Sequence, residues 1–423
     1  MLFIYGSLSM GGIETFFVRM AKERARLGLA TSLLLLSKPE DCNDELLTEV
    51  KKYALVMFAK DIFLFMPSMC TRFSLLAPVN IEKLKVLLKN VDQIHTFDGM
   101  HALFGLRISD KLNKRVPITI GFYHYIKYLW GGDKVALYEK INRKFVFDYL
   151  PSESLLFFSE GSRQLYSKYK QINFDNSNIF SLGVVDKKEV QLNDAISKPL
   201  KIVAVGRLVE FKTYNFYMLV VIKNLINNGL SIQFDIYGDG PLLNKLVKEI
   251  NDNGLNKHIT LKGTLNYSKF DEVVSQSDIF IGDGTAIVQA SSLGVPSIVG
   301  VQNVVEPKSY GFFCDVYNYQ YTRKGLDLPL LPVEQLILEY ISMSSNERLE
   351  LKKKHLSCIK QFTNESCQAS MDKLKHIEMP SYDFKYNKLL YLLSKKLDQL
   401  NMKFNKNHPR LTQFEEFRNL DEK

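Results

Sequence analysis

Two cationic side chains directly follow an apolar stretch near the middle of the chain. In "KIVAVGRLVEFKT" the run 201–205 has the composition of a buried strand, Gly206 ends it, and Arg207 and Lys212 follow five positions apart. A guanidinium binds phosphate as a planar fork and an ammonium binds it as a compact charge. The spacing therefore predicts a bound anion, for which a diphosphate is the best match. Two ordinary surface cations are the alternative.

A glycine-rich turn lies in the same half of the chain. The stretch "GDGTAIVQ" (282–289) places Gly284 ahead of a predicted helix. The first amides of a helix have no partner within it and can bind anions. Here they belong to Thr285, Ala286 and Ile287. A glycine-rich turn alone is weak evidence, but together with the two cations it favours a phosphate-binding site.

The first half of the chain contains a similar feature. "GSLSMGGIETFF" places Gly11 and Gly12 between a predicted strand and a predicted helix. Glycine there permits close approach of the backbone to a ligand. The stretch does not match the G-x-G-x-x-G dinucleotide fingerprint, which argues against an NAD-dependent oxidoreductase. A loop that only caps the helix is the alternative.

Short apolar runs alternate with helix-period segments, a pattern typical of parallel sheets covered by helices. The first half predicts a helix at 13–28 and strands at 2–6, 31–37, 53–58, 93–97, 116–124 and 154–159. The second half predicts helices at 214–228 and 241–251 and strands at 198–206, 232–238, 259–263, 279–283 and 294–301. The fold class is therefore α/β, with two Rossmann-like doubly wound domains. We expect them at 1–190 and 191–375, with a helical C-terminal tail at 376–423. Ligands of such sheets bind beyond the carboxyl ends of the strands, where the cations and glycines fall.

Positive charge is concentrated in one part of the chain. The formal net charge is +9, and residues 51–150 hold 16 Lys and Arg against 8 Asp and Glu. Such a zone can attract anionic lipid headgroups, a phosphorylated substrate or nucleic acid. Nucleic acid fits least, because no zinc-finger, RNP or basic-zipper pattern accompanies the zone. An ordinary lysine-rich surface is the alternative.

The start of the chain and its cysteines predict a cytoplasmic protein. "LFIYG" follows Met1 without the basic start and cleavage site of a secretory signal. The longest apolar segments fall well short of the roughly 20 residues that span a bilayer. Five scattered cysteines without a C-x-x-C pair indicate reduced thiols and no zinc site.

Six stretches in a fixed order over about residues 1–300 resemble a GT-B glycosyltransferase of the family 4, retaining type. They are "GGIETFFVRMAKERARLG", "VDQIHTFDG", "SEGSRQLY", "VAVGRLVEFKT", "DIYGDGPL" and "ASSLGVPSIVG". The resemblance implies two Rossmann-like domains facing a cleft, with a nucleotide-sugar donor on the second and an acceptor on the first. It also implies sugar transfer to a saccharide, and the basic zone favours a lipid-linked acceptor in bacterial surface polysaccharide assembly (O-antigen or capsule). The protein would then touch the inner face of the plasma membrane peripherally.

The resemblance assigns roles to individual residues. Arg207 and Lys212 match the pair that holds the donor diphosphate of a UDP or GDP sugar in place of a metal ion, so no metal and no cofactor are expected. His124 matches a cleft histidine near the transferred sugar, and His95 is a candidate on the acceptor side. Donor contacts are implied for Gly11, Gly12, Gly238, Gly284, Thr285, Ala286, Ile287 and Gln289. The donor phosphate itself can accept the acceptor proton, so no separate general base is required.

One segment departs from the family pattern, which has two glutamates where this chain has Ile281 and Gln289. Gln289 can still hydrogen-bond ribose hydroxyls through its amide, and Asp283 is near enough in sequence to replace the first carboxylate. The departure raises a second hypothesis, a degenerate homologue that binds a partner transferase or a glycan without turnover. A sugar-nucleotide epimerase fits less well, because it needs more acid and base residues than the chain offers.

Overall fold

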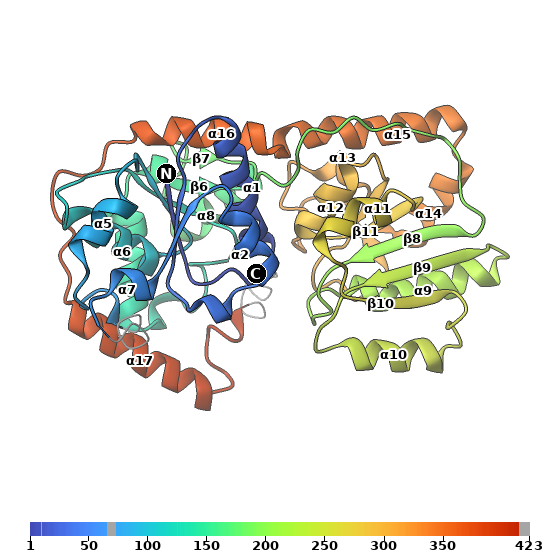
Figure 1. The fold of residues 1–423 in the computed structure, drawn as a ribbon. Helices are drawn as coiled ribbons and strands as arrows, with labels where there is room; N and C mark the ends of the chain where they lie inside the picture. The colour runs from blue at the N-terminus through green and yellow to red at the C-terminus, as the bar shows by residue number, and fades with distance from the viewer. Residues whose placement is uncertain (10, 66–72, 125, 414–423) are drawn as a thin grey trace. The chain divides into compact units, whose positions relative to one another are not determined.

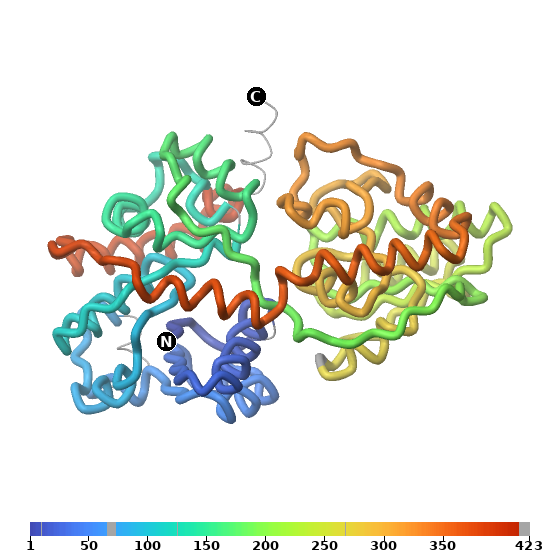
Figure 2. Tube along the Cα trace, turned by 90° about the horizontal axis from the view of Figure 1, so that it is seen from above, coloured from blue at the N-terminus to red at the C-terminus, as the bar shows by residue number. Residues whose placement is uncertain are grey.

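The computed structural model describes residues 1–9, 11–65, 73–124 and 126–413. The chain divides into two compact units (Figure 1). Unit 1 comprises Met1–Gly183 and Asn364–Lys423, and unit 2 comprises Val184–Thr363. Figure 2 follows the chain from unit 1 into unit 2 and back again. Within the described residues, every helix is too short or too polar to span a lipid bilayer.

Unit 1 is built on a seven-stranded parallel sheet with the order β3-β2-β1-β4-β5-β6-β7. The strands are β1 (Leu2–Tyr5), β2 (Ser32–Leu35), β3 (Leu55–Phe58), β4 (Ile94–Thr96), β5 (Ile118–Gly121), β6 (Leu155–Phe157) and β7 (Asn178–Ile179). The helices are α1 (Gly12–Arg26), α2 (Asp44–Val50), α3 (Ala59–Ile62), α5 (Ile81–Leu87), α6 (Gly99–Asp110), α7 (Leu137–Lys144), α8 (Glu160–Lys170), α16 (Asn364–Lys373) and α17 (Lys388–Phe404).

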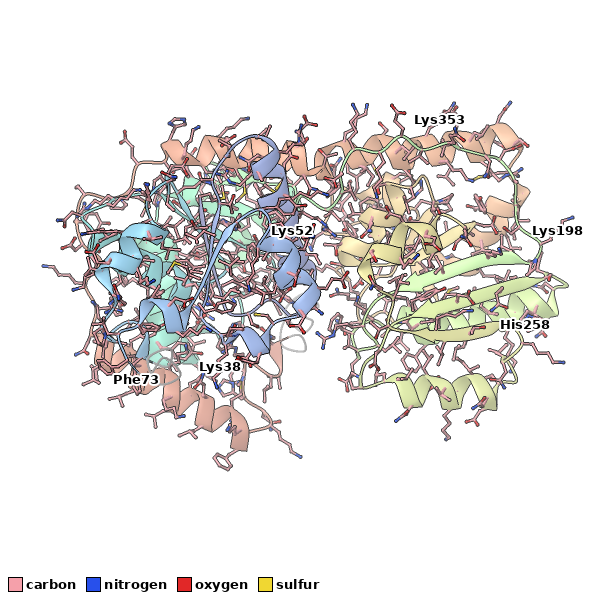
Figure 3. All side chains as sticks on the ribbon, viewed as in Figure 1. Lys38, Lys52, Phe73, Lys198, His258 and Lys353 are labelled. Carbon is pink, nitrogen blue, oxygen red and sulfur yellow. The ribbon has the colours of Figure 1, made fainter. Side chains whose placement is uncertain are left out.

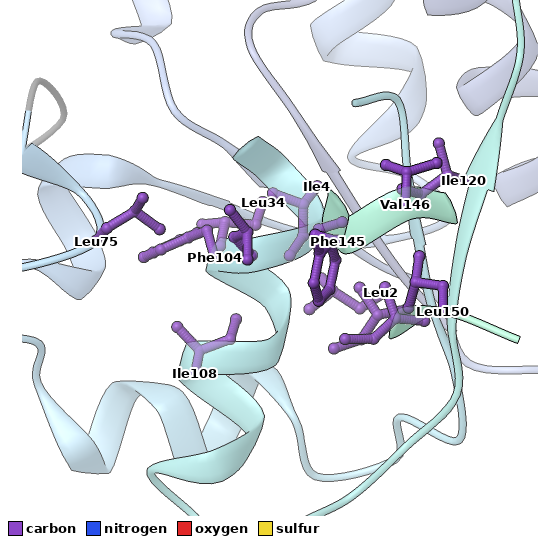
Figure 4. Close-up of a cluster of buried hydrophobic side chains, with 14 of the residues drawn as sticks. Leu2, Ile4, Leu34, Leu75, Phe104, Ile108, Ile120, Phe145, Val146 and Leu150 are labelled. Atoms are coloured by element: carbon purple, nitrogen blue, oxygen red, sulfur yellow. The ribbon is translucent and has the colours of Figure 1, made fainter. Parts of the chain in front are cut away.

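Both faces of this sheet are buried. Successive side chains of a strand point to opposite faces, so Leu2 and Ile4 enter one core and Phe3 enters the other. The first core also contains Phe104 of α6 and Phe145 (Figure 4). A strand covered by helices on both sides has to be apolar at nearly every position, as "LFIY" is.

Unit 2 is built on a five-stranded parallel sheet with the order β10-β9-β8-β11-β12. The strands are β8 (Leu200–Val205), β9 (Ile232–Tyr237), β10 (Ile259–Gly263), β11 (Ile279–Gly282) and β12 (Ser297–Val299), with a small antiparallel pair β13 (Lys308–Ser309) and β14 (Leu331–Pro332). The helices are α9 (Tyr214–Asn227), α10 (Leu243–Asp252), α11 (Phe270–Val274), α12 (Gly284–Ser291), α13 (Phe313–Val316), α14 (Val333–Ser342) and α15 (Ser345–Cys358).

The predicted fold class, two Rossmann-like α/β domains with a C-terminal helix, is confirmed. The observed division differs in detail from the expected ranges 1–190, 191–375 and 376–423. The first unit ends at Gly183, and α16, expected with the second domain, belongs to unit 1. The reason is packing, because Cys367 and Met371 of α16 enter the core that contains Phe16 and Phe17 of α1.

The surfaces of both units carry many lysines. Exposed examples from the two units are labelled in Figure 3 and include Lys38, Lys52, Lys198 and Lys353. The four cysteines among the described residues, Cys42, Cys314, Cys358 and Cys367, are free thiols. Cys70 lies outside the described residues.

Candidate functional site

Each sheet has one point at which the strand order reverses. In unit 1 it lies between β1 and β4, and in unit 2 it lies between β8 and β11. The loops after those strands leave room for a ligand at the carboxyl edge of a doubly wound sheet. Arg207 and Lys212 follow β8, and the turn before α12 follows β11. The predicted anion-binding residues of unit 2 therefore lie at its switch point.

The loop after β8 is fixed by the turn after β9. The amide of Leu208 donates to the carbonyl oxygen of Asp239 at 2.9 Å. The two backbones approach so closely that a Cβ on Gly238 would lie 1.9 Å from the Gly206 oxygen, and a Cβ on Gly240 would lie 2.4 Å from the Leu208 oxygen. Gly238, predicted as a donor contact, thus has a backbone-packing role. The contact holds the loop that carries the cations.

The two cations leave this loop in different surroundings. Arg207 is exposed, whereas Lys212 is half-buried and its Nζ lies 2.7 Å from Oδ1 of Asp283. Asp283 is buried and also accepts hydrogen bonds from Gln302 Nε2 at 2.9 Å and from the Tyr214 hydroxyl at 3.4 Å. Burial, followed by the Asp283 charge, raises the pKa of Tyr214 well above its ordinary value, so the hydroxyl keeps its proton. Asp283 therefore fixes the ammonium, and the guanidinium can reorient.

The same aspartate leaves the start of α12 uncapped. Asp283 occupies the N-cap position, but its side chain accepts no hydrogen bond from the helix because it points to the lysine. Gly284 has φ +59°, a conformation that favours glycine, and a Cβ there would meet nothing within 4 Å. Thr285 and Ala286 are half-buried, and Ile287 is fully buried. The first turn of α12 therefore presents backbone amides beside open space and next to the ammonium of Lys212.

The two positions that depart from the family pattern have different environments. Ile281 is buried within β11, so it has no access to a ligand. Gln289 is also buried, and its Nε2 donates to Oδ1 of Asp271 at 3.1 Å. Asp271 is partly exposed and its Oδ2 contacts Lys188. A carboxylate therefore lies next to Gln289, but it comes from α11.

In unit 1, His95 is a core residue. Its side chain is completely buried, with Nδ1 2.9 Å from the Thr119 hydroxyl and Nε2 2.7 Å from the Tyr123 hydroxyl. Burial lowers the pKa of His95 to about 3, so the ring is neutral. Because Thr119 donates to the Ile94 oxygen, Nδ1 donates to Thr119 and Nε2 accepts from Tyr123. His95, predicted on the acceptor side, is thus enclosed by side chains of its own unit. The ring instead fixes Tyr123.

His124 lies past the end of β5 and is half-buried. Its Nδ1 accepts a weak hydrogen bond from the amide of Ile126 at 3.5 Å. Burial, followed by the charge of Lys127, lowers the pKa of His124 to about 4. At neutral pH the ring is therefore uncharged, and it can donate or accept a hydrogen bond without a net charge.

Asp98, at the start of α6, is a carboxylate close to the segment that contains His124 and Lys127. It caps α6 through the amide of His101, its Oδ1 lies 2.8 Å from His101 Nδ1, and its Oδ2 lies 4.0 Å from Lys127 Nζ. Burial alone would raise the pKa of Asp98, but His101, Lys127 and the hydrogen bonds outweigh it and hold the pKa well below its usual range. Burial lowers the pKa of Lys127, whose Nζ lies 4.1 Å from the Phe97 ring centroid.

The glycines before α1 are close to Glu14. Gly11 is extended, with φ −173°, and a Cβ on it would lie 2.4 Å from Glu14 Oε2. Glu14 is buried and accepts hydrogen bonds from Ser9 at 3.0 Å and Tyr5 at 3.3 Å. Gly12 is the first residue of α1. The close approach predicted at Gly11 is thus made by the carboxylate of this chain.

Three carboxylates at these edges are not among the predicted site residues, namely Glu14, Asp98 and Asp271. Asp98 had a readable signal, because an aspartate directly after a strand and before a helix is a typical N-cap. Asp271 had none, because it meets Gln289 only through packing of α11 on α12. No group of three or more His, Cys, Asp or Glu residues that could hold a metal ion occurs within the ranges that the structure covers.

Residues 186–330 match the family described as glycosyl transferases group 1. The match covers about a third of the chain and lies within unit 2. The matched region contains Arg207, Lys212 and the start of α12. No curated protein matches the sequence.

Several solved structures resemble the whole chain. Anabaena HepE in complex with UDP and glucose has a TM-score of 0.60 at 13% identity, covering 89% of this chain and 99% of its own. A glycosyltransferase from Rickettsia africae has a TM-score of 0.62 at 15% identity, covering 88% and 97%. A mutant of S. aureus TarM in complex with UDP and sugar ligands has a TM-score of 0.59 at 10% identity, covering 89% and 99%. At these identities the likeness establishes the fold, which is GT-B.

Proposed function

We propose that this protein is a retaining glycosyltransferase of the family 4 type that transfers a sugar from a UDP or GDP sugar to a saccharide acceptor. One observation carries the proposal. At the switch point of unit 2, the Asp283–Lys212 ion pair at 2.7 Å holds an ammonium beside the uncapped start of α12, and the exposed guanidinium of Arg207 lies on the same loop as Lys212. Cations and free amides at such a point suit a diphosphate.

In this mechanism the cations stabilise the leaving group. Arg207, Lys212 and the amides of Gly284, Thr285 and Ala286 neutralise the charge that develops on the diphosphate as the sugar departs, so no metal ion or cofactor is required. The departing phosphate accepts the proton of the acceptor hydroxyl. His124, neutral at physiological pH, hydrogen-bonds the transferred sugar from unit 1. Gly11 and Gly12 contribute only to the backbone shape at the start of α1, and the buried Ile287 contributes only to the packing of α12.

The ribose is held by Asp271 of α11, a carboxylate that takes the place of the family glutamate at position 289. Gln289 is buried and donates its amide to Asp271, which remains partly exposed. Asp271 therefore offers a carboxylate to ribose hydroxyls, and Gln289 orients it. The Gln289 oxygen is an acceptor that suits a donor group of the nucleotide.

The acceptor is a lipid-linked saccharide in bacterial surface polysaccharide assembly, such as O-antigen or capsule, and the protein acts in the cytoplasm at the inner face of the plasma membrane. The concentration of Lys and Arg in residues 51–150 supports this assignment, because anionic lipid attracts such a zone.

A thermal-shift panel of UDP, GDP, ADP and CMP tests the donor site. Binding to the native state at 100 times the Kd stabilises it by about 2.7 kcal/mol, which is readily measured. We expect UDP or GDP to raise the Tm of the parent protein and to have much less effect on Arg207→Ala. No shift with any diphosphate, or an equal shift in the variant, would contradict the proposed site.

The second candidate function is a binding partner of another transferase without turnover. Position 281 holds a buried isoleucine where the family has a glutamate, and the loss of that carboxylate favours this candidate. Hydrolysis and transfer assays with UDP and GDP sugars separate the two. Nucleotide binding with no measurable turnover would support the binding protein.

A further inference from the structure

Helix α17 has one apolar face that packs on unit 1. Tyr391 and Leu392 are buried in the same core as Phe145 and Ile4. The Tyr391 hydroxyl donates to Asn142 Oδ1 at 2.8 Å. Two further bonds join the helix to α7, from the Tyr138 amide to Ser394 at 3.1 Å and from the Tyr138 hydroxyl to Asp398 at 3.1 Å. The helix is thus anchored along the edge of unit 1 (Figure 1).

The opposite face of α17 is also apolar, and it is exposed. At 100° per residue, a second group of side chains falls within an arc of roughly 100° on the side away from the anchor. These side chains, called the apolar stripe below, are between 40 and 86% exposed. They are Leu389, Leu390, Leu393, Leu397, Leu400 and Phe404.

A groove extends the apolar stripe across the surface of unit 1. Leu390, Leu393 and Leu397 line a hollow of about 550 Å³ together with Trp130 and Leu137. Leu137 is exposed at the start of α7. Trp130 is buried and is the only tryptophan in the chain.

Cations border the apolar stripe on one side. From Lys385 to Gln413 the sequence has six lysines and one arginine against one aspartate. That aspartate, Asp398, is turned inward and lies 3.0 Å from His408 Nε2. Lys396 and Lys403 border the stripe on one side, by their positions on the helix. A second hollow, which shares Trp130 with the first, is lined by four cations and two carboxylates, namely Lys140, Arg143, Lys144, Lys170, Asp133 and Asp148, so it is cationic on balance.

We propose that the apolar stripe of α17 inserts into an anionic lipid bilayer, with the bordering lysines on the headgroups. A helix with an apolar stripe and a lysine-rich border lies in the plane of a membrane interface. Lysine stems bury along apolar surface while their ammonium groups reach anionic headgroups. The stripe is too narrow and the helix too polar for it to cross the bilayer.

The charge of this surface favours an anionic bilayer over two alternatives, a second copy of the chain and a different protein. A second copy of the chain on the same face would bring the lysines that border the stripe, Lys396 and Lys403, close to those of its partner, and like charges repel. Protein interfaces are depleted in lysine, whereas this stripe is bordered by it. The proposed function supplies only the reason for this lipid contact, which is access to a lipid-linked acceptor. The contact itself can be tested without any donor or acceptor.

Vesicle flotation tests the proposal. The full chain should float with vesicles of phosphatidylcholine and phosphatidylglycerol and much less with phosphatidylcholine alone. The double variant Leu393→Gln/Leu397→Gln should bind the anionic vesicles about tenfold or more weakly, because it removes apolar area from the stripe. Lys396→Gln/Lys403→Gln should weaken binding and reduce its salt dependence.

Matched controls separate this effect from misfolding. Val220→Gln/Val247→Gln changes two valines of unit 2 that are about as exposed, and it should leave vesicle binding unchanged. Circular dichroism melts and the UDP or GDP thermal shift should match the parent in all three double variants, so failure of the donor site and failure of the lipid site give different results.

Trp130 offers an independent readout. Phospholipid brominated on its acyl chains should quench Trp130 fluorescence in the parent protein and not in Leu393→Gln/Leu397→Gln. Absence of vesicle binding, or binding that is equal in the stripe variants and the parent, would overturn the proposal. So would a parent that elutes as a dimer and becomes monomeric in the stripe variants, since the stripe would then be a protein interface.

Discussion

In unit 2 the loops at the switch point are fixed by backbone contacts, whereas in unit 1 the polar groups of β4 and of the loops at its carboxyl end are fixed by other side chains. Gly238 and Gly240 allow the turn after β9 to pack directly against the loop after β8, on which Arg207 remains exposed. In unit 1, Asp98 and His95 are each enclosed by partners of their own chain. The first arrangement suits a charged ligand that binds the exposed guanidinium. The second suits shape and hydrogen-bond selection of a neutral sugar.

Removing the exposed guanidinium should have the largest effect on activity. Arg207→Ala deletes a cation that we propose to stabilise the leaving group, so we expect kcat/KM to fall about 10²–10³-fold, as for loss of one oxyanion-stabilising donor. Because Arg207 is exposed, the free energy of unfolding should change by less than about 0.5 kcal/mol. Steady-state kinetics and urea denaturation measure the two quantities.

The matching change in unit 1 is His124→Ala. We expect it to lower turnover and to leave nucleotide affinity unchanged, because His124 is assigned to the sugar. Equal loss of nucleotide affinity in Arg207→Ala and His124→Ala would contradict the assignment of Arg207 to the diphosphate and of His124 to the sugar.

The backbone contact of unit 2 should be sensitive to a single methyl group. Gly238→Ala places a Cβ 1.9 Å from the Gly206 oxygen, so one of the two loops has to move. We expect a loss of about 2–4 kcal/mol in the free energy of unfolding, together with weaker nucleotide binding. Gly254→Ala is the control, since Gly254 has φ +68° with nothing within 4 Å and should cost only about 1 kcal/mol. Similar losses of unfolding free energy in Gly238→Ala and Gly254→Ala would mean that the backbone contact between Gly238 and Gly206 is not tight.

Both units contain a buried neutral histidine, and these should make the protein sensitive to acid. Burial lowers the pKa of His95 to about 3 and that of His355 to about 4. The His355 ring accepts the Ser297 amide at Nε2 (3.0 Å) and donates to the Leu351 oxygen from Nδ1 (2.8 Å), so a second proton would break one bond. The unfolded histidines, with a pKa near 6.5, take up protons first as the pH falls.

Stability should therefore be intact above about pH 6.5 and should fall by about 1.4 kcal/mol per pH unit for each histidine as the pH decreases toward 4. Urea denaturation at several pH values measures this slope. His95→Gln and His355→Gln should each remove one histidine's share of it. If His95→Gln left the slope unchanged, the side-chain network of unit 1 would not depend on a neutral ring.

The sequence predicts the repeating architecture better than the local contacts. The strand at 259–263 matches β10, and the helices at 13–28 and 214–228 match α1 and α9 within two residues at each end. The pattern of apolar runs is local, so it can be read directly. The two-residue strands β7, β13 and β14 are too short to have a pattern, and the packing of α16 on unit 1 depends on contacts with residues more than 300 positions away.

The two candidate histidines show how strand ends decide whether a side chain lies in the core or at the sheet edge. His95 lies within β4, where it points into the core, whereas His124 lies past the end of β5. The predicted strands 93–97 and 116–124 each include one histidine, so strand ends known to within one or two residues would have separated them. The backbone contact at Gly238 and the pairing of Gln289 with Asp271 involve residues that are distant in sequence, and no periodicity reports them.

The smallest effect is expected at the relocated carboxylate of unit 2. Asp271→Asn should weaken UDP or GDP binding about fivefold to tenfold, the cost of replacing a charged hydrogen-bond acceptor by a neutral one at a partly exposed site. Isothermal titration calorimetry measures it, and Glu272→Gln, an exposed neighbour on the same helix, is the control.

Gln289→Glu tests the same idea in the opposite direction. If Gln289 were simply a weakened form of the family glutamate, restoring the carboxylate would tighten nucleotide binding. If Asp271 has taken over that role, Gln289→Glu places a second carboxylate where an amide now lies 3.1 Å from Asp271 Oδ1. Like charges at that distance repel, so the variant should lose stability and bind nucleotide more weakly than the parent. The sign of the change in Kd therefore decides whether the acidic group of this edge comes from α12 or from α11.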